Sequence, residues 1–381
     1  MLIYLLMGIA FVVAFGFTWI SVPLARKIAE KIGAIDVPKD ARRMHKVPTP
    51  RLGGLAVFLG FLVSVLCFCE ISRELIGLLC GAVIIVILGI FDDSHDLSAK
   101  LKFCVQIIAA LVTIYVGDIK INFFTNPNIF SGDKILLLSD WIAVPCTVLW
   151  IVAITNAVNL IDGLDGLAAG VSTIAAVSLV FIASMVDEPA IALIAIIIAG
   201  ACLGFLPFNF RKKKKIFLGD TGATFLGYAL AVLSVQGGFK SYAVISFAVP
   251  VLIFGLPIFD TAFAMLRRVL TGRSPMSPDR GHIHHRLVDM GFSQKQSVFI
   301  LYAMSGVLGL TAVVLAESGA MRALLLLIGV LIVIFAGSLL TRRRKPPQDE
   351  PPGDSVKVTL DKIGTTDEQD KIDGQNGMKK K

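Results

Sequence analysis

The chain has 381 residues, of which 55% are hydrophobic and only 17% are charged, and its mean hydropathy is +0.79. A soluble globular protein carries about 25% charged residues. This composition excludes an ordinary soluble protein in spite of a formal net charge of +8. It predicts an all-α polytopic membrane protein whose main partner is a lipid bilayer, and no nucleic-acid partner is expected.

Apolar runs long enough to cross a bilayer recur along the chain. About eleven spans are predicted, at 1–22, 53–70, 75–91, 103–117, 141–158, 167–186, 189–207, 221–236, 241–266, 297–316 and 321–341. The first run lacks a basic leader and a small-residue cleavage pattern, so we expect a retained span rather than a signal peptide. The prediction is one membrane domain over 1–341, followed by a polar, disordered cytoplasmic tail over 342–381.

The basic residues indicate the orientation of the spans. Of the 36 Lys and Arg residues, all but Arg73, Lys120, Lys134, Lys240 and Arg322 belong to alternate loops on one side of the predicted membrane or to the tail. Cytoplasmic loops carry the excess of Lys and Arg. We therefore expect the N-terminus outside and the C-terminus in the cytoplasm.

Polar residues that can do chemistry gather in five loops of the predicted cytoplasmic side. These segments are 36–54, 91–102, 155–170, 208–222 and 272–287. Such a one-sided cluster favours a site at the cytoplasmic interface, where a water-soluble substrate can meet a membrane-bound one. A transporter of a nucleotide sugar or lipid-linked sugar is the alternative, but its polar residues would more often lie near the bilayer midplane.

Two adjacent aspartates, Asp92 and Asp93, end the predicted span 75–91. A helix C-terminus is already negative, so two acids are unfavourable there unless a cation compensates them. Lys100 and Lys102 follow closely in the sequence. A solvated helix end would explain one lone aspartate, whereas the pair favours a functional site.

Asp220 lies in "FLGDTG" (217–222), at the start of the predicted span 221–236. A flexible Gly-Asp-Thr-Gly turn at a helix N-terminus suits phosphate binding. A simple N-cap aspartate explains the same letters. A hard cation such as Mg²⁺, which prefers oxygen ligands, is the third interpretation.

The stretch "TNAVNLIDGLDGLAAG" (155–170) carries Asn156, Asn159, Asp162 and Asp165 at intervals of three. Steps of three place the first three along one slowly drifting face of a helix end, before Gly163 and Gly166 break the helix. They can therefore point together at a ligand. The alternative is that they only satisfy the exposed carbonyls of a helix end.

The motifs "GIFDDSHDLSAKLK" (89–102), "NAVNLIDGLDGLAAG" (156–170), "FLGDTG" and "DRGHIHHRL" (279–287) together resemble one family. It is the superfamily of polyprenyl-phosphate N-acetylhexosamine-1-phosphate transferases. Within it the chain is most similar to the bacterial undecaprenyl-phosphate N-acetylglucosaminyl-1-phosphate transferases. The resemblance covers about residues 1–340 and leaves the tail outside.

The resemblance implies that undecaprenyl phosphate attacks the β-phosphorus of a UDP-sugar, UDP-N-acetylglucosamine, and releases UMP. It implies Mg²⁺, with Mn²⁺ as the alternative ion. Asn159 and Asp220 would be metal ligands and Lys102 a phosphate ligand. Asp92 would deprotonate or orient the lipid phosphate, supported by Asp93, and a covalent aspartyl intermediate stays open.

The remaining candidates are grouped by role. Asp162 is placed with the catalytic residues, and Asn156 and Asp165 with the substrate-binding residues. By resemblance Asn209 is a uracil contact. His45 and Arg51, in "HKVPTPRLGG" (45–54), are candidates for the lipid phosphate, although a solvated basic loop fits them equally well. Asp260 is an acid near the inner end of span 241–266, where such a residue is more often functional than not.

The histidine loop separates subfamilies of the superfamily. His282, His284 and His285 stand in "HIHHR", which resembles the N-acetylglucosamine enzymes; the muramoyl-pentapeptide transferases, which remain the alternative, carry three consecutive histidines. With Arg280 nearby, the loop is expected to bind diphosphate rather than zinc. The expected location is the bacterial cytoplasmic membrane, with the active site on the cytoplasmic face, and a homodimer is left open.

Overall fold

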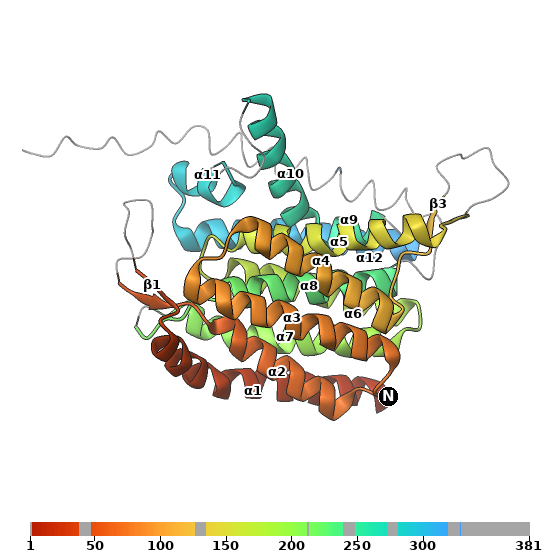
Figure 1. Ribbon diagram of the computed structural model, residues 1–381, viewed down its shortest axis with the longest axis horizontal. Helices are drawn as coiled ribbons and strands as arrows, with labels where there is room; N and C mark the ends of the chain where they lie inside the picture. Colours follow the sequence, from red (N-terminus) through yellow and green to blue (C-terminus); the bar gives the residue numbers. More distant parts are fainter. Residues whose placement is uncertain are drawn as a thin grey trace, which may run out of the picture. The chain divides into compact units, whose positions relative to one another are not determined.

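The computed structural model describes residues 2–37, 47–125, 135–211, 213–238, 248–272, 281–318 and 328, which all belong to the compact unit Met1–Val333. Long helices dominate it (Figure 1). They are α1 (Leu2–Ile32), α2 (Gly53–Phe68), α3 (Arg73–His95), α4 (Ala99–Gly117), α5 (Asp140–Ile161), α6 (Leu167–Met185), α7 (Pro189–Asn209), α8 (Gly219–Gly238), α9 (Ala248–Ile253), α10 (Gly255–Leu270), α11 (Ile283–Asp289) and α12 (Gln294–Ser318).

Within the described residues, seven helices are long and apolar enough to cross a membrane: α1, α3, α4, α5, α6, α7 and α12. The apolar helix α2 is shorter, with 16 residues. The prediction of a helical polytopic membrane protein is therefore confirmed in its general form. The count of about eleven spans and the orientation of the termini stay predictions, and the run 321–341 lies outside the described residues except for Ile328.

Two short β-hairpins depart from the all-α expectation. β1 (Ile35–Asp36) pairs antiparallel with β2 (Thr49–Pro50), with Ile35 opposite Pro50. β3 (Phe123–Thr125) pairs with β4 (Ile135–Leu137), with Phe124 opposite Leu136. The first hairpin lies beside the candidate site, since Phe217 donates from its backbone N–H to the Pro50 carbonyl.

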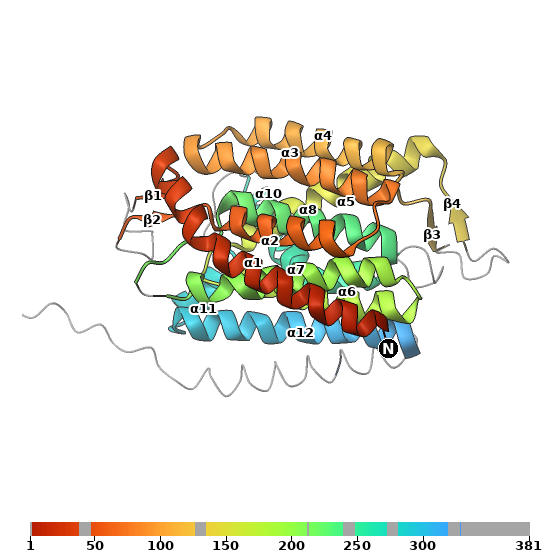
Figure 2. The ribbon, with the colours of Figure 1, turned by 90° about the horizontal axis from the view of Figure 1, so that it is seen from below.

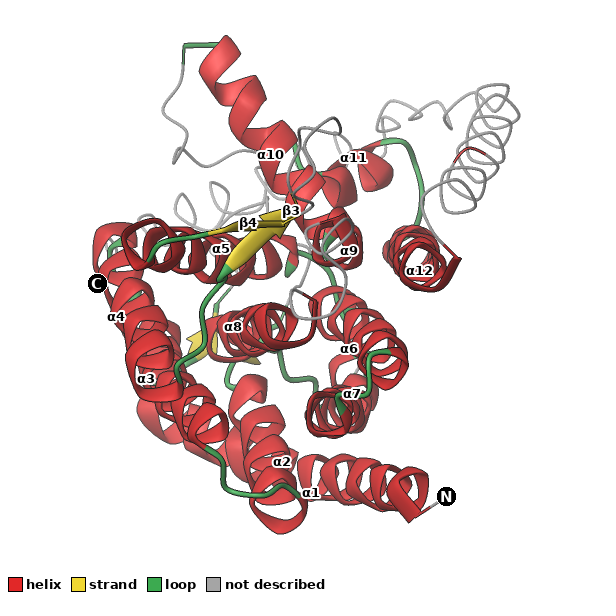
Figure 3. Ribbon diagram, turned by 90° about the vertical axis from the view of Figure 1, so that its right-hand side faces the viewer, coloured by secondary structure: helices red, strands yellow, loops and turns green. Residues whose placement is uncertain are grey.

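Helix α8 lies at the centre of the other helices, as the end-on view shows (Figure 3). It packs against α2, α3, α5, α6 and α7, and every residue from Thr221 to Val235 is buried. A helix that is apolar on all sides is suited to such burial. The first turn of α8, with Asp220, is thereby brought close to the ends of several neighbouring helices.

Two glycines allow α2 and α3 to approach the start of α8. A Cβ on Gly54 would lie 2.0 Å from the Gly222 nitrogen, and a Cβ on Gly89 would lie 2.3 Å from the Thr221 Cα. Helices α2 and α3 both run alongside α8 (Figure 2). Only glycine fits at these two contacts without a backbone shift, so the sequence sets the distance between the Asp92–Asp93 pair and Asp220.

The run predicted as a single span over 241–266 is broken within its described part. Helix α9 ends at Ile253, Phe254 forms a turn, and α10 begins at Gly255 and projects steeply from the other helices (Figure 1). Pro250, Gly255 and Pro257 predict a kink here, and the break confirms it. One face of α10 exposes apolar side chains such as Phe263 and Leu270, while Asp260 and Arg268 are buried on the other.

Candidate active site

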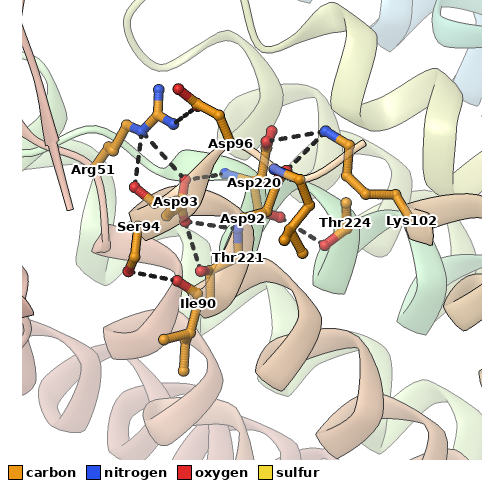
Figure 4. Close-up of polar contacts among 11 residues, drawn as sticks. Arg51, Ile90, Asp92, Asp93, Ser94, Asp96, Lys102, Asp220, Thr221 and Thr224 are labelled. Carbon is orange, nitrogen blue, oxygen red and sulfur yellow. Dashed lines mark hydrogen bonds and ion pairs between the residues drawn. The ribbon is translucent and has the colours of Figure 1, made fainter. Parts of the chain in front are cut away.

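Asp93 joins the end of α3 to the start of α8. Its Oδ1 accepts a hydrogen bond from the Asp220 backbone N–H (2.9 Å), and its Oδ2 accepts from the Thr221 N–H (3.0 Å) and from the Thr221 hydroxyl (2.6 Å) (Figure 4). The first N–H groups of a helix lack intrahelical partners and carry a positive partial charge. Asp93 therefore caps α8 from another helix, and this capping holds Asp220 in place.

Asp92 faces a lysine on the next helix. Its Oδ2 lies 2.8 Å from the Lys102 Nζ, and its Oδ1 accepts from the Leu97 N–H at 2.8 Å. The same Lys102 ammonium lies 3.6 Å from the Asp220 Oδ2, so one cation bridges two carboxylates (Figure 4). This supplies the compensating charge that two acids at a helix C-terminus require.

Arg51 borders the carboxylates from the first loop. Its Nη2 lies 2.8 Å from the Asp96 Oδ1, and its Nε lies 3.7 Å from the Asp93 Oδ1. The loop is held by the backbone, because Gly53 and Gly54 donate to the carbonyls of Phe217 and Leu218. Arg51 is thus placed beside the first turn of α8 by a strand-like pairing that no local sequence pattern indicates.

An acidic pocket of about 360 Å³ lies at this junction. Its lining includes five aspartates, two asparagines and a few cationic, aromatic and imidazole side chains: Asp36, Asp93, Asp162, Asp165, Asp220, Asn159, Asn209, Arg51, Lys215, Phe217 and His285. Asp92 and Lys102 do not line it, although Lys102 lies 3.6 Å from the Asp220 carboxylate. The structure thus brings together loops that are up to about 250 residues apart in sequence.

The pocket offers oxygen ligands suited to a hard cation. Asn159 and Asp220 both line it, and the Asn159 side chain makes no hydrogen bond to any residue that the structure describes. Within that part of the chain, no group of three or more His, Cys, Asp or Glu residues is arranged to hold a metal. Mg²⁺ is usually bound by one or two protein ligands together with substrate phosphates and water, and Asn159 and Asp220 are the candidate ligands that the pocket offers.

The turn after α5 carries two further acids. Asp162 follows the helix directly, and its burial, followed by the charges of Asp93 and Asp165, raises its pKa to about 7. Asp165 is neutralised by the Lys215 Nζ at 2.5 Å. One acid of the turn can therefore hold a proton near neutral pH while the other stays paired with a cation.

Two side chains hold the end of this turn at Gly166, whose φ is +78°. Asn209 accepts from the Gly166 N–H and donates to the Ile216 carbonyl (2.8 Å). The Tyr302 hydroxyl donates to the Gly166 carbonyl at 2.5 Å. Both the oxygen and the nitrogen of the Asn209 amide are thus hydrogen-bonded to the backbone, and its contact with uracil stays a prediction.

The histidine loop is fixed by Asp260. The Asp260 carboxylate lies 2.8 Å from the His282 Nδ1 and accepts from the Ile283 N–H at 2.7 Å. His284 packs against Gly163 of the acidic turn, and burial, then the neighbouring His285, lowers the pKa of its ring to about 4. The imidazole of His284 is therefore neutral at physiological pH, and His285 is the member that lines the pocket.

Asn156 does not line the pocket. Asn156 donates to the Gln106 Oε1 (2.6 Å) and to the Val152 carbonyl (2.7 Å), and so ties α5 to α4. The face it shares with Asn159 drifts by about 60° per step of three residues, which is enough to turn Asn156 away. His45 and Arg280 lie outside the described residues, so their roles stay predictions.

Sequence reasoning missed several residues of the site. Thr221, Phe217 and Asp36 each resemble an ordinary helix-start or loop residue. Lys215 belongs to a basic run at a span end, which is interpreted chiefly as a positive-inside anchor and secondarily as an attractor of anionic lipid or UDP-sugar. Tyr302 is hidden in the apolar run 297–316, where a polar hydroxyl one turn inside a span was the available signal. Their importance comes from helices that meet only in three dimensions.

The helices and the pocket together define a class: an integral membrane protein with an acidic, oxygen-rich site at one end of its helices, suited to phosphate chemistry. Residues 75–238 match the glycosyl transferase family 4 profile. The chain is 42% identical over 311 residues to the probable undecaprenyl-phosphate N-acetylglucosaminyl 1-phosphate transferase of Bacillus subtilis (strain 168), covering 81% of this chain and 85% of the relative.

Two further relatives have similar descriptions. The decaprenyl-phosphate N-acetylglucosaminephosphotransferase of Mycobacterium tuberculosis (strain ATCC 25618 / H37Rv) is 35% identical over 77% of this chain and 79% of its own. The undecaprenyl-phosphate alpha-N-acetylglucosaminyl 1-phosphate transferase of Escherichia coli (strain K12) is 29% identical over 80% and 82%. The chain belongs to glycosyl transferase family 4, the superfamily of polyprenyl-phosphate N-acetylhexosamine-1-phosphate transferases that its motifs indicate.

Proposed function

We propose that this protein transfers N-acetylglucosamine 1-phosphate from UDP-N-acetylglucosamine to undecaprenyl phosphate in the bacterial cytoplasmic membrane. A lipid phosphate oxygen forms a bond to the β-phosphorus of the donor. The bond from that phosphorus to the bridging oxygen breaks, and UMP leaves with the oxygen. The observation that carries the proposal is the Asp92–Lys102–Asp220 arrangement beside an acidic pocket, in a chain 42% identical to a relative described by this activity.

Lys102 is the group proposed to bind the lipid phosphate. Its ammonium already lies between two carboxylates and can exchange one of them for a phosphate oxygen. A phosphate monoester is largely ionised at pH 7, since its second pKa is about 6. The main role of Asp92 is therefore to orient Lys102 and the incoming phosphate, and accepting a proton is a secondary role.

An apolar groove next to Lys102 suits the polyprenyl chain. It measures about 340 Å³ and lies between α4 and α5. The described residues that line it are all apolar: Phe103, Ile107, Leu111, Val144, Pro145, Val148, Leu149 and Val152. Phe103 directly follows Lys102, so the groove and the proposed phosphate ligand belong to the same end of α4. This proximity supports a lipid acceptor over a soluble one.

The donor is proposed to occupy the acidic pocket. Asn159 and Asp220 would hold Mg²⁺ or Mn²⁺ there together with the diphosphate; when bound, the ion neutralises charge on the transferred phosphoryl group. Such a cation is needed because two anionic substrates must meet in a pocket lined by five aspartates, and their negative charges repel one another. His285, in the pocket lining, would donate to the diphosphate, and the neutral His284 would support it against Gly163.

The excess of Lys and Arg in the loops that form the pocket supports a cytoplasmic site, with the N-terminus outside. The test is an assay of the purified protein with UDP-N-acetylglucosamine, undecaprenyl phosphate and Mg²⁺. UMP release that depends on both substrates is expected. Transport of a substrate without UMP release, or a strong preference for UDP-N-acetylmuramoyl-pentapeptide in competition, would refute the proposal.

A further inference from the structure

A second cavity lies next to the active-site pocket, between the end of α1, the segment after α7 and the start of α12. It measures about 590 Å³ and is lined by Arg26, Arg211, Lys213, Lys214, Lys215 and Lys295. In the lining formed by described residues, the one acidic group is Asp165, which Lys215 already neutralises. Arg26 is paired with Glu30 of α1 at 3.1 Å, so the positive charge that no described acid balances is carried by Arg211, Lys213, Lys214 and Lys295.

Arg211 is held in place without using its donors. Its guanidinium carbon lies 4.3 Å from the ring centroid of Phe208 and 5.8 Å from that of Trp19. Phe208 and Trp19 in turn pack edge to face at 4.8 Å. Among the residues that the structure describes, Arg211 makes no hydrogen bond or ion pair. A guanidinium that lies over two aromatic rings, with N–H groups that no described residue uses, is well suited to bind a phosphate.

The position of the cavity matches the depth of lipid headgroups. Trp19, which contacts Arg211, is 37% exposed on α1 and precedes Arg26, the first charged residue of the helix, by about two turns. Tryptophan is enriched at the membrane–water interface. A basic span end alone would explain the charges as a positive-inside anchor. It would not require a concave wall or a pinned guanidinium.

We propose that this cavity is a second anion site, separate from the active site, that binds a phosphate group at the membrane surface. The phosphate belongs either to the headgroup of an anionic phospholipid or to a soluble phosphate compound. Lys215, Asp165 and Gln294 line both this cavity and the active-site pocket. A bound phosphate therefore competes with Asp165 for Lys215, which couples the second site to the acidic turn at 162–166.

The test compares two double variants of the full chain with equal charge changes. Lys213→Gln/Lys214→Gln removes two cations of the cavity, and Lys27→Gln/Lys31→Gln removes two exposed cations of α1 that do not line it. Binding is measured in two arms without nucleotide sugar: phosphatidylglycerol against phosphatidylcholine by native mass spectrometry, and inorganic pyrophosphate by calorimetry in a zwitterionic detergent. The result is thus independent of the proposed transfer reaction.

We expect the cavity variant to weaken binding in one arm by about 25-fold, since each of the two interfacial cations contributes about fivefold, and the α1 variant to stay within about twofold of wild type. Loss in the phosphatidylglycerol arm assigns the phosphate to a lipid, and loss in the pyrophosphate arm assigns it to a soluble compound. Arg211→Lys, which keeps the charge but loses the stacked plane, should also weaken binding. Equal losses in both double variants, or none in either arm, would overturn the proposal.

Discussion

At the scale of single residues, the site separates two carboxylates that are adjacent in the chain. Asp92 faces Lys102, whereas Asp93 is consumed by three hydrogen bonds from the start of α8. Two neighbours on a helix differ by about 100° in direction, so they can serve different partners. Asp93 thus holds the metal candidate Asp220 in place, while Asp92 acts on Lys102. Replacing Asp92 and replacing Asp220 are therefore expected to have different effects.

Replacing the proposed metal ligands tests this division. Asp220→Asn keeps the size of the side chain but removes its charge, and Asn159→Ala removes a neutral oxygen. Both should raise the Mg²⁺ concentration needed for half-maximal UMP release, Asn159→Ala more mildly, and Asp220→Asn should lower the rate at least about a thousandfold. Asp92→Asn should lose turnover with its Mg²⁺ requirement nearly unchanged. A near wild-type rate for Asp220→Asn would refute the assignment.

The hydroxyl of Tyr302 is expected to position the acidic turn. Tyr302→Phe removes only the bond to the Gly166 carbonyl, and one hydrogen bond contributes about 0.5–1.5 kcal/mol. We expect kcat/KM for the nucleotide sugar to fall about threefold to tenfold, with the lipid KM unchanged. Tyr115→Phe, at an exposed tyrosine of α4, is the matched control. Equal behaviour of the two variants would remove Tyr302 from the site.

The pKa of Asp162, raised from an ordinary 3.8 to about 7 mainly by burial, makes stability depend on pH. A carboxyl whose pKa is higher in the folded state contributes stability below about pH 4 and loses it as the pH rises through about 7. Without divalent ions, Asp162→Asn should therefore unfold at a higher temperature than wild type, by a margin that grows from pH 5 to pH 8. The control is Asp118→Asn, at an exposed aspartate that caps the C-terminus of α4. Its unfolding temperature should follow that of wild type at every pH. A difference between Asp162→Asn and wild type that does not change with pH would contradict the prediction.

At the scale of elements, the site depends on how closely α2, α3 and α8 meet. Gly54 contributes no side chain to the site, but a Cβ added to it would overlap the backbone of Gly222. The ladder from Gly53 and Gly54 to Phe217 and Leu218 crosses the same junction. A change here should move Arg51 and Asp220 together.

Gly54→Ala is the variant that tests this junction. The added methyl group would overlap the Gly222 backbone, and overpacking typically costs about 1–3 kcal/mol. We expect a lower unfolding temperature and a loss of UMP release larger than the loss of folded protein. Gly8→Ala, where a Cβ would meet nothing within 4 Å, should match wild type in both measurements. Full activity of Gly54→Ala would mean that the junction tolerates a shift.

At the scale of the whole molecule, the chemistry is confined to one end of the described helices, and the bilayer-sized helices carry few ionisable groups. The polar residues 346–381 follow the last predicted span and lie outside the described residues. A polar terminus without apolar periodicity tolerates deletion in most proteins. The tail is thus expected to be separable from the membrane domain.

Truncation after Lys345 should leave turnover within about twofold of the full chain, because the chain end contributes no predicted site residue. The measurement is UMP release from membranes that contain equal amounts of the two proteins. An internal control is the same truncation combined with Asp220→Asn, which should be as inactive as the single variant. Loss of most activity on truncation alone would assign the tail a direct role.

The sequence by itself determined that the chain is a helical membrane protein and to which family it belongs, because apolar runs of bilayer length and four motifs are local patterns. It also identified Asp92, Asn159, Asp162 and Asp220 as candidate catalytic or metal-binding residues. Only the tertiary structure decided which of them meet: Asp93 became the cap of α8, Asn156 turned toward Gln106, and Asp260 became the anchor of the histidine loop. Direction around a helix and close approach at glycines depend on packing between segments distant in the chain, and no local pattern encodes them.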